Sequence, residues 1–399
     1  MKRILFVASD MEIGGAERAL LGLLNSIDTN LYAVDLFLLR HRGPFMKLIP
    51  PHINLLPENK YYSDLGVPIN EVIRKKHFSM VAARTIGKWK AKRFIARNKI
   101  SGANSLEIHY SFRFTRTILP TISEKEYDLA IGFTIPYYIV AEKVKAKHTA
   151  VWLHTDYSKL AGDTDEELKV WSAYEYIVSI SYDVTKAFLS KFPSLENRIV
   201  EIENIVSPEL IAQQAKAEDV HTEMPHEQGV VRLLSVGRFT SAKNFDNVPD
   251  ICKRILNNGF AIKWYIIGFG GDESLIKRKI TESGMQNNVI LLGKKDNPYP
   301  YIAECDMYIQ PSRFEGKAVT VREAQILNKP VIITNYHTAK SQLRDGVDGI
   351  IVPLDNERCA KGICDVLSNK KIIIRLIENT KKQNYGNSNE AVKLYNMID

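Results

Sequence analysis

A strand, a glycine-bearing turn and a helix are expected to follow one another between residues 310 and 324, an arrangement that suits anion binding. Backbone amides in the first turn of a helix have no partner within the helix and lie at the positive end of its dipole. The amides of Lys317, Ala318 and Val319 are therefore expected to hold a phosphate-like anion. Gly316 has no side chain, so the backbone can approach that anion closely.

Two carboxylates flank the same turn, Glu315 before the helix and Glu323 about two turns into it. Carboxylate oxygens accept hydrogen bonds from neighbouring hydroxyl groups, so the pair suits a sugar or a ribose. Singly, each residue also fits a structural role, Glu315 as a partner of the helix dipole and Glu323 as a solvated helix position. The complete string, rather than either residue, predicts a binding site.

Two cations follow an earlier apolar run, Arg238 directly after Gly237 and Lys243 on the next loop. Guanidinium and ammonium groups in such places suit the two phosphates of a diphosphate, and a pair of surface charges is the alternative. The next apolar run ends in a turn that contains Gly268 and Gly270. These glycines let backbone pass close to a ligand, although a plain turn would also explain them.

Parallel sheets are expected to position these residues, because short apolar runs alternate with longer amphipathic stretches along the chain. The runs lie at residues 3–9, 33–39, 53–56, 129–133, 149–154 and 176–181, and again at 231–236, 262–267, 289–292, 307–310, 331–334 and 349–352. Ligands bind beyond the carboxyl ends of such strands. We expect two domains, residues 1–195 and 196–386, with a last helix in 387–399 packing back on the first.

Composition limits the class of protein. The chain of 399 residues exceeds the usual ~100–200 residues of one domain, and its 45% hydrophobic and 25% charged content excludes disordered, collagen-like and integral-membrane classes. No apolar run approaches the ~18 residues that span a bilayer, and the run from Ile4 to Ala8 is too short for a signal sequence. A cytoplasmic location is expected.

No metal site is expected. The four cysteines have neither Cys-x-x-Cys spacing nor a histidine at ligand spacing. Asp163-Thr164-Asp165 resembles a D-x-D metal motif, but Thr164 with Glu167 three residues later fits a capping box before a helix.

The net charge of +8 comes almost entirely from residues 72–106. This segment has ten lysines or arginines and no acidic residue, whereas the rest of the chain has 44 basic and 46 acidic residues. Arg84, Lys88 and Lys92 recur at helical spacing near Trp89, which suits a helix on an anionic membrane surface. A solvated helix face is the alternative. Interleaved aromatics would also suit nucleic acid, but no recognised binding module is present, so no nucleic-acid partner is expected.

Taken together, these motifs resemble glycosyltransferase family 4, whose members are retaining enzymes of the GT-B fold. The resemblance spans nearly the whole chain and is carried by Gly14-Gly15-Ala16-Glu17, His154, Arg238 with Lys243, Gly268-x-Gly270, Pro311-Ser312 and Glu315-x7-Glu323. It implies an α/β structure in which two Rossmann-like domains, each a doubly wound parallel sheet, face one another across a cleft.

The resemblance also implies roles for the acidic and basic residues. Arg238 and Lys243 fall where the family contacts the donor diphosphate. Glu315 falls where a carboxylate binds the transferred sugar, and Glu323 where one binds the ribose.

Three further positions match the family's pattern. His154 matches a histidine that lies beside the donor sugar in the family. Gly15 lies on the loop after the first strand, and the turn with Lys294 resembles the family's turn that binds the base of the nucleotide. Lys317 and Gly271 stand where many members have other residues, so Lys317 could alter the donor preference.

The implied function is transfer of a hexose or N-acetylhexosamine from a nucleotide sugar, with UDP favoured, to a sugar acceptor. The acceptor is expected to be a lipid-linked intermediate of a cell-surface polysaccharide, met at the inner face of the plasma membrane. Cations and helix amides stabilise the departing diphosphate, so no metal or other cofactor is required. An enzyme for a soluble small molecule or a protein acceptor remains open, as does a catalytically silent nucleotide-sugar-binding protein. No oligomeric state is predicted.

Overall fold

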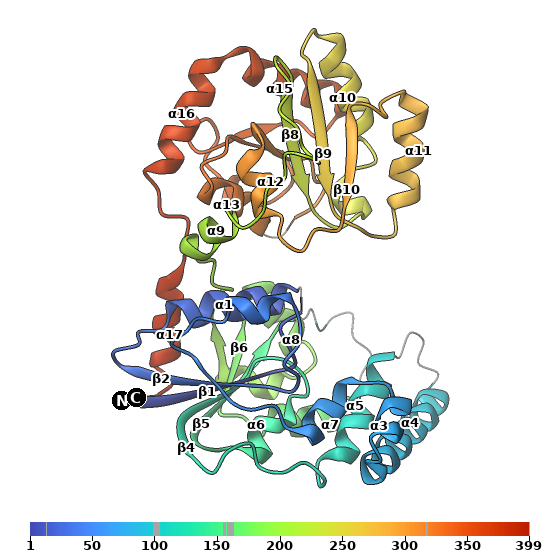
Figure 1. Cartoon of the computed structure of the whole chain (residues 1–399), viewed down its shortest axis with the longest axis vertical. Helices are drawn as coiled ribbons and strands as arrows, with labels where there is room; N and C mark the ends of the chain where they lie inside the picture. Colours follow the sequence, from blue (N-terminus) through green and yellow to red (C-terminus); the bar gives the residue numbers. More distant parts are fainter. Residues whose placement is uncertain (13, 99–103, 155–156, 158–162, 316–317, 399) are drawn as a thin grey trace. The chain divides into compact units, whose positions relative to one another are not determined.

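The computed structural model divides into two units and describes residues 1–12, 14–98, 104–154, 157, 163–315 and 318–398 (Figure 1). The first unit comprises Met1–Ile205 with Asn387–Asp399, and the second comprises Val206–Gly386. From the sequence, a boundary at residue 195 was predicted. The structure places it at Ile205, because the strand β7 (Ile199–Glu201) pairs with β6 (Tyr176–Ser179) at the edge of the first sheet.

The first unit contains a parallel sheet in the order β3-β2-β1-β4-β5-β6-β7. Besides β6 and β7, its strands are β1 (Lys2–Ala8), β2 (Tyr32–Leu38), β3 (Asn54–Leu55), β4 (Glu126–Gly132) and β5 (Lys145–Leu153). Its helices are α1 (Gly15–Ser26), α2 (Lys60–Ser63), α3 (Ile69–Arg74), α4 (Phe78–Asn98), α5 (Asn104–Thr115), α6 (Tyr138–Lys143), α7 (Thr164–Trp171), α8 (Tyr182–Leu189) and α17 (Val392–Tyr395). The strand order reverses direction at β1, next to β4, which is the point where such sheets bind ligands.

The second unit contains a parallel sheet in the order β10-β9-β8-β11-β12-β13. Its strands are β8 (Val231–Val236), β9 (Ile262–Ile267), β10 (Val289–Gly293), β11 (Met307–Gln310), β12 (Val331–Thr334) and β13 (Ile350–Val352). Its helices are α9 (Pro208–Gln214), α10 (Val248–Asn257), α11 (Glu273–Ser283), α12 (Tyr299–Glu304), α13 (Val319–Ile326), α14 (Ala339–Gln342), α15 (Asn356–Ser368) and α16 (Lys370–Lys381). Here the order reverses at β8, next to β11.

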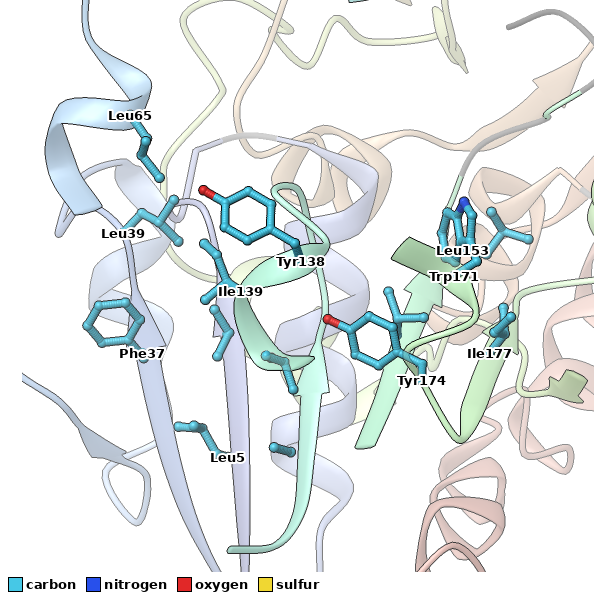
Figure 2. Packing of buried hydrophobic residues seen from close by; sticks show 14 of the residues in the cluster. Leu5, Phe37, Leu39, Leu65, Tyr138, Ile139, Leu153, Trp171, Tyr174 and Ile177 are labelled. Carbon is cyan, nitrogen blue, oxygen red and sulfur yellow. The ribbon is translucent and has the colours of Figure 1, made fainter. Parts of the chain in front are cut away.

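Burial on both faces explains why the strands are nearly continuous apolar runs. In the second unit, Leu233 packs with α10 and α15, whereas its neighbour Leu234 packs on the opposite face with α12 and α13. In the first unit, Leu5 of β1 and Phe37 of β2 lie in one buried cluster with Ile139 of α6 (Figure 2). The expectation of two Rossmann-like, doubly wound parallel sheets is confirmed.

Candidate functional site

Lys243 and Glu315 form an ion pair in which Nζ lies 2.6 Å from Oε1. Lys243 ends a short 3-10 helix, η5 (Ser241–Lys243), on the loop after β8, and Glu315 lies on the loop after β11. Because β8 and β11 are neighbouring parallel strands, both loops leave the sheet at the same edge. The side chains are 21% and 10% exposed. The structure thus brings together a cation and a carboxylate that the sequence assigned to one site.

Three donors converge on one oxygen of the Glu315 carboxylate. Besides Lys243, Ser312 Oγ donates to Oε1 at 2.6 Å and Gln310 Nε2 at 3.2 Å. Thr338 Oγ1 donates to the Glu315 carbonyl at 2.8 Å, which fixes the backbone as well. Among the described residues no donor engages Oε2, so this oxygen can accept a hydrogen bond from a ligand hydroxyl.

A second ion pair joins the same two loops. Arg313 donates through both terminal nitrogens to the Asp246 carboxylate, at 2.9 and 2.8 Å, and also to the Ser241 carbonyl at 2.7 Å. Asn244, buried in the left-handed conformation with φ of 61°, donates to the Pro311 carbonyl at 2.8 Å. These contacts hold Lys243 opposite Glu315. Asp246 and Arg313 were not predicted from the sequence, although they lie three residues after Lys243 and two before Glu315.

The predicted glycines allow close contacts between backbones. A Cβ at Gly268 would lie 1.9 Å from the Gly237 carbonyl oxygen, and one at Gly270 would lie 2.4 Å from that of Phe239. A Cβ at Gly237 would lie 3.1 Å from Cε of Lys243. Gly268 and Gly270 therefore let the loops after β8 and β9 cross, whereas Gly237 leaves room for the lysine.

Arg238 and Lys294 lie at the carboxyl ends of two strands of the same sheet, β8 and β10. Arg238 follows β8 and is exposed, and its side chain has no ion pair within the described part of the chain. Lys294 follows β10, and its Nζ lies 5.6 Å from the ring centroid of Phe269, which follows β9 and is 50% exposed.

The start of α13 differs in one respect from the expectation. Ala318 is the N-cap and Val319 the first helical residue, while Gly316 and Lys317 lie outside the described residues. The Ala318 amide is not unpaired, because it donates to Oε1 of Gln342 at 2.7 Å. The backbone amide of Ala318 was predicted to be unpaired, but it donates a hydrogen bond to this side-chain oxygen.

Glu323 is buried rather than solvated. Its side chain lies on the buried face of α13 with 3% exposure, and Oε1 accepts a hydrogen bond from the Tyr299 hydroxyl at 2.8 Å. The alternative of a solvated helix position is wrong, because a carboxylate at this depth needs a polar partner and has one.

His154 follows β5 in the first unit and is held in one neutral form. Its Nε2 lies 2.9 Å from the Phe133 carbonyl oxygen, which can only accept, so Nε2 carries the proton. Burial lowers the pKa of His154 to about 4, against the smaller opposing effect of the Phe133 hydrogen bond. Near neutral pH its Nδ1 is therefore a hydrogen-bond acceptor. Gly15, also in this unit, begins α1, and a Cβ there would meet no atom within 4 Å.

In the part of the chain that the structure describes, no cluster of three or more His, Cys, Asp or Glu side chains could hold a metal ion. Asp163 is the N-cap of α7 and accepts a hydrogen bond from the Glu166 amide at 3.4 Å. The capping interpretation of the Asp163-Thr164-Asp165 motif holds, with the cap one residue earlier than expected.

Comparison with solved structures defines the architecture as GT-B, the class of proteins with two Rossmann-like domains. HepE of Anabaena, solved with UDP and glucose, matches over 96% of this chain and 94% of its own, with a TM-score of 0.58 and 15% identity. TarM of Staphylococcus aureus, solved as a mutant in complex with fondaparinux, alpha-GlcNAc-glycerol and UDP, matches over 100% of both chains, with a TM-score of 0.62 and 12% identity.

Residues 218–383, which lie within the second unit, match the family described as Glycosyl transferases group 1. A relative in Campylobacter jejuni, N-acetylgalactosamine-N,N'-diacetylbacillosaminyl-diphospho-undecaprenol 4-alpha-N-acetylgalactosaminyltransferase, is 29% identical over 142 residues. That match covers 35% of this chain and 38% of the relative, so the chain aligns with well under half of the relative's length. The resemblance inferred from the sequence is confirmed.

The tautomer and pKa of His154 predict how stability depends on pH. Because the pKa in the folded state, about 4, lies below the ordinary value, the unfolded chain binds this proton more readily, and stability falls as the pH falls from about 6.5 toward 4. We expect the Tm of the first unit to fall less steeply between pH 6.5 and 4.5 in His154→Gln than in the wild type. His221→Gln, at an exposed histidine, should keep the wild-type slope. Equal slopes for His154→Gln and the wild type would contradict the assignment.

Because Arg313 pairs with Asp246 through two hydrogen bonds, we expect a conservative substitution of Arg313 to lower the stability of the second unit. Lysine keeps the charge but cannot donate two parallel hydrogen bonds, so Arg313→Lys should destabilise the second unit by about 1–2 kcal/mol in urea unfolding. Arg358→Lys is the matched control, because Arg358 pairs with Asp355 at an exposed position and should change stability little. If both variants unfold like the wild type, the Arg313 pair does not hold the two loops together.

Proposed function

We propose that this protein is a retaining glycosyltransferase that moves a hexose or N-acetylhexosamine from a UDP-sugar to a lipid-linked sugar acceptor during synthesis of a cell-surface polysaccharide. The observation that carries the proposal is the Lys243–Glu315 pair, a cation and a hydroxyl-accepting carboxylate 2.6 Å apart at the carboxyl edge of the second sheet. It lies in the segment, residues 218–383, that matches the family Glycosyl transferases group 1.

The chemistry needs opposite charges to be stabilised at neighbouring places. Cleaving the anomeric C–O bond leaves extra negative charge on the nucleotide diphosphate and positive character on the sugar carbon. Lys243 and Arg238 supply cations for the diphosphate, and such preorganised groups are effective in a site that excludes water. When Lys243 turns toward phosphate, Ser312 and Gln310 still hold the Glu315 carboxylate.

The sugar is recognised through hydroxyl groups. Oε2 of Glu315 accepts from one hydroxyl of the sugar. Considered by itself, the first unit offers Nδ1 of the neutral His154 as a hydrogen-bond acceptor for a hydroxyl. The Ala318 amide joins the phosphate contacts once Gln342 releases it. The amide then donates to a charged phosphate oxygen instead of the neutral side-chain oxygen of Gln342. Hydrogen bonds to charged acceptors are stronger than those to neutral ones.

UDP is the favoured donor nucleotide. The half-exposed ring of Phe269 offers a face on which a nucleobase can stack, with Lys294 beside it. Glu323 is the carboxylate proposed to bind the ribose. HepE and TarM, which share the fold, were solved with UDP.

The lipid-linked acceptor is supported by the surface of α4. Phe78, Ile86 and Trp89 are 66%, 47% and 57% exposed, on the side of α4 opposite the buried Met80 and Gly87. Large apolar side chains among lysines and arginines suit an anionic membrane surface. The named relative acts on an undecaprenol-linked substrate.

Arg84, which was predicted to lie with Lys88 and Lys92 on the exposed face of α4, does not lie there. Arg84 is 7% exposed and donates to the carbonyls of Asp64, at 2.6 Å, and Val67, at 2.7 Å. It therefore anchors α4 to the preceding segment. Within the described chain no helix combines the length and apolar character needed to cross a bilayer.

Donor hydrolysis without acceptor tests the proposed chemistry. Glu315→Gln removes the charge that holds Lys243 and the stronger acceptor for the sugar, so release of sugar from a UDP-sugar should fall about 10²–10³-fold. Glu357→Gln, at an exposed position of α15, should hydrolyse at the wild-type rate. A wild-type rate in Glu315→Gln would contradict the role of Glu315, and UDP binding without hydrolysis by the wild type would identify a silent binding protein.

Sedimentation with anionic vesicles tests the membrane surface. Replacing four cations by glutamine should lower the partition coefficient about tenfold or more, since each lysine or arginine near such a surface contributes about 1 kcal/mol; the four are Lys88, Lys90, Lys92 and Arg93. The matched control replaces four exposed cations of α16, namely Lys370, Lys371, Arg375 and Lys381. Equal partitioning of both variants and the wild type would favour a soluble acceptor.

A further inference from the structure

The first unit contains a cavity that none of the proposed donor contacts uses. It opens to solvent. One wall is α5, a second is the segment from Ile135 to Tyr138 after β4, and a third is α7 with Tyr157.

The walls of this cavity are mainly aromatic and aliphatic. Rings of Tyr137 and Tyr157 pack against Trp171, with centroids 4.9 and 5.7 Å apart. The apolar lining consists of Leu106, Tyr110, Phe112, Ile135, Pro136, Tyr137, Tyr138, Tyr157, Val170 and Trp171. The inner surface therefore favours an apolar occupant.

The polar groups in the walls are largely paired with one another. Tyr110 donates to Asp163 at 2.6 Å, and Arg113 lies 3.0 Å from Glu166, so both pairs link α5 to α7. Arg116 pairs with Glu142. The lining arginines thus already have carboxylate partners. A sugar ring needs several converging donors and acceptors, and the described walls offer few, which favours a hydrocarbon chain.

The pKa values of two partly buried groups in the walls are shifted toward their neutral forms. Burial lowers the pKa of His109, whose Nδ1 lies 3.9 Å from Glu167. Burial also raises the pKa of Glu167 to about 7, with Asp163 raising it further and Lys191 lowering it. The phenols of Tyr137 and Tyr157 face the same carboxyl. At pH 6 the Glu167 carboxyl is therefore mostly protonated, and this uncharged side chain suits an uncharged occupant.

The cavity adjoins the helix with the exposed apolar and basic face. The helix α5, which forms one wall, packs against α4. Tyr110 lines the cavity, and its ring centroid lies 5.8 Å from that of Phe94 on α4. Lys90 of α4 in turn lies over the ring of Phe114 on α5 at 4.9 Å. The cavity and the proposed membrane surface thus belong to one helical hairpin.

We propose that this cavity binds the isoprenoid chain of the lipid-linked acceptor, an inference that rests on the proposed function. Its apolar aromatic walls, its paired arginines and its position behind the α4–α5 hairpin together favour a hydrocarbon chain leaving a membrane. The cavity would hold the part of the chain nearest the sugar, so it would select acceptors by their lipid as well as by their sugar.

Trp171 provides the readout, because it lies in the cavity wall. In a Trp89→Phe background, which removes the exposed tryptophan of α4, titration with farnesol should change tryptophan fluorescence saturably at pH 6. If only the form with neutral Glu167 binds, affinity should be about tenfold weaker at pH 8 than at pH 6. Glu167→Gln cannot ionise and should bind equally at both pH values.

Filling the cavity tests the location. Val170→Phe should weaken farnesol binding at least tenfold, whereas Val392→Phe, the same substitution at a position 53% exposed on α17, should not change it. If Val170→Phe does not fold, the pH arm with Glu167→Gln decides. The inference is overturned if farnesol gives no saturable change, if N-acetylglucosamine gives the change instead, or if Glu167→Gln keeps the pH dependence. Donor hydrolysis without farnesol binding overturns this inference alone, while farnesol binding without donor hydrolysis overturns the proposed function.

Discussion

The contact between Lys243 and Glu315 is the interaction on which the interpretation of this protein depends. An amine and a carboxylate this close would be a minor surface pair on most loops, worth little in stability. Here both side chains are mostly buried, and three further side chains and a second ion pair hold them in place. Many polar contacts that fix one ion pair at the edge of a parallel sheet are typical of a binding site. An ion pair that only stabilises the fold would not need to be positioned so closely.

The two units differ in whether their candidate binding residues form ion pairs or are shifted toward neutral forms. In the second unit, Lys243 pairs with Glu315 and Arg313 pairs with Asp246 on loops that follow neighbouring strands. In the first unit, burial shifts the pKa values of His154, His109 and Glu167 toward their neutral forms. A charged site suits a diphosphate and a neutral one suits hydroxyls and hydrocarbon. This division agrees with a donor bound by the second unit and an acceptor bound by the first.

Much of the fold could be predicted from the sequence because burial on both sheet faces leaves a clear signal, a continuous apolar run. The strands and the motif around Glu315 follow from such runs. Arg313 with Asp246 could not be predicted, since it depends on which two loops the strand order makes neighbours. The hydrogen bond from the Ala318 amide to Gln342 could not be predicted for the same reason. Arg84 was misassigned because a helical period does not show which face of α4 meets the backbone carbonyls of another segment.

The most direct measurement of the central claim is the affinity for UDP, by isothermal titration calorimetry, of the wild type and of Lys243→Met, which keeps the length of the side chain and removes its charge. The account predicts that the wild type binds UDP and that Lys243→Met binds it at least about tenfold more weakly, since a charge-assisted contact to phosphate is lost. Equal affinity of the two proteins would contradict it, because the ammonium group would then have no part in holding the nucleotide.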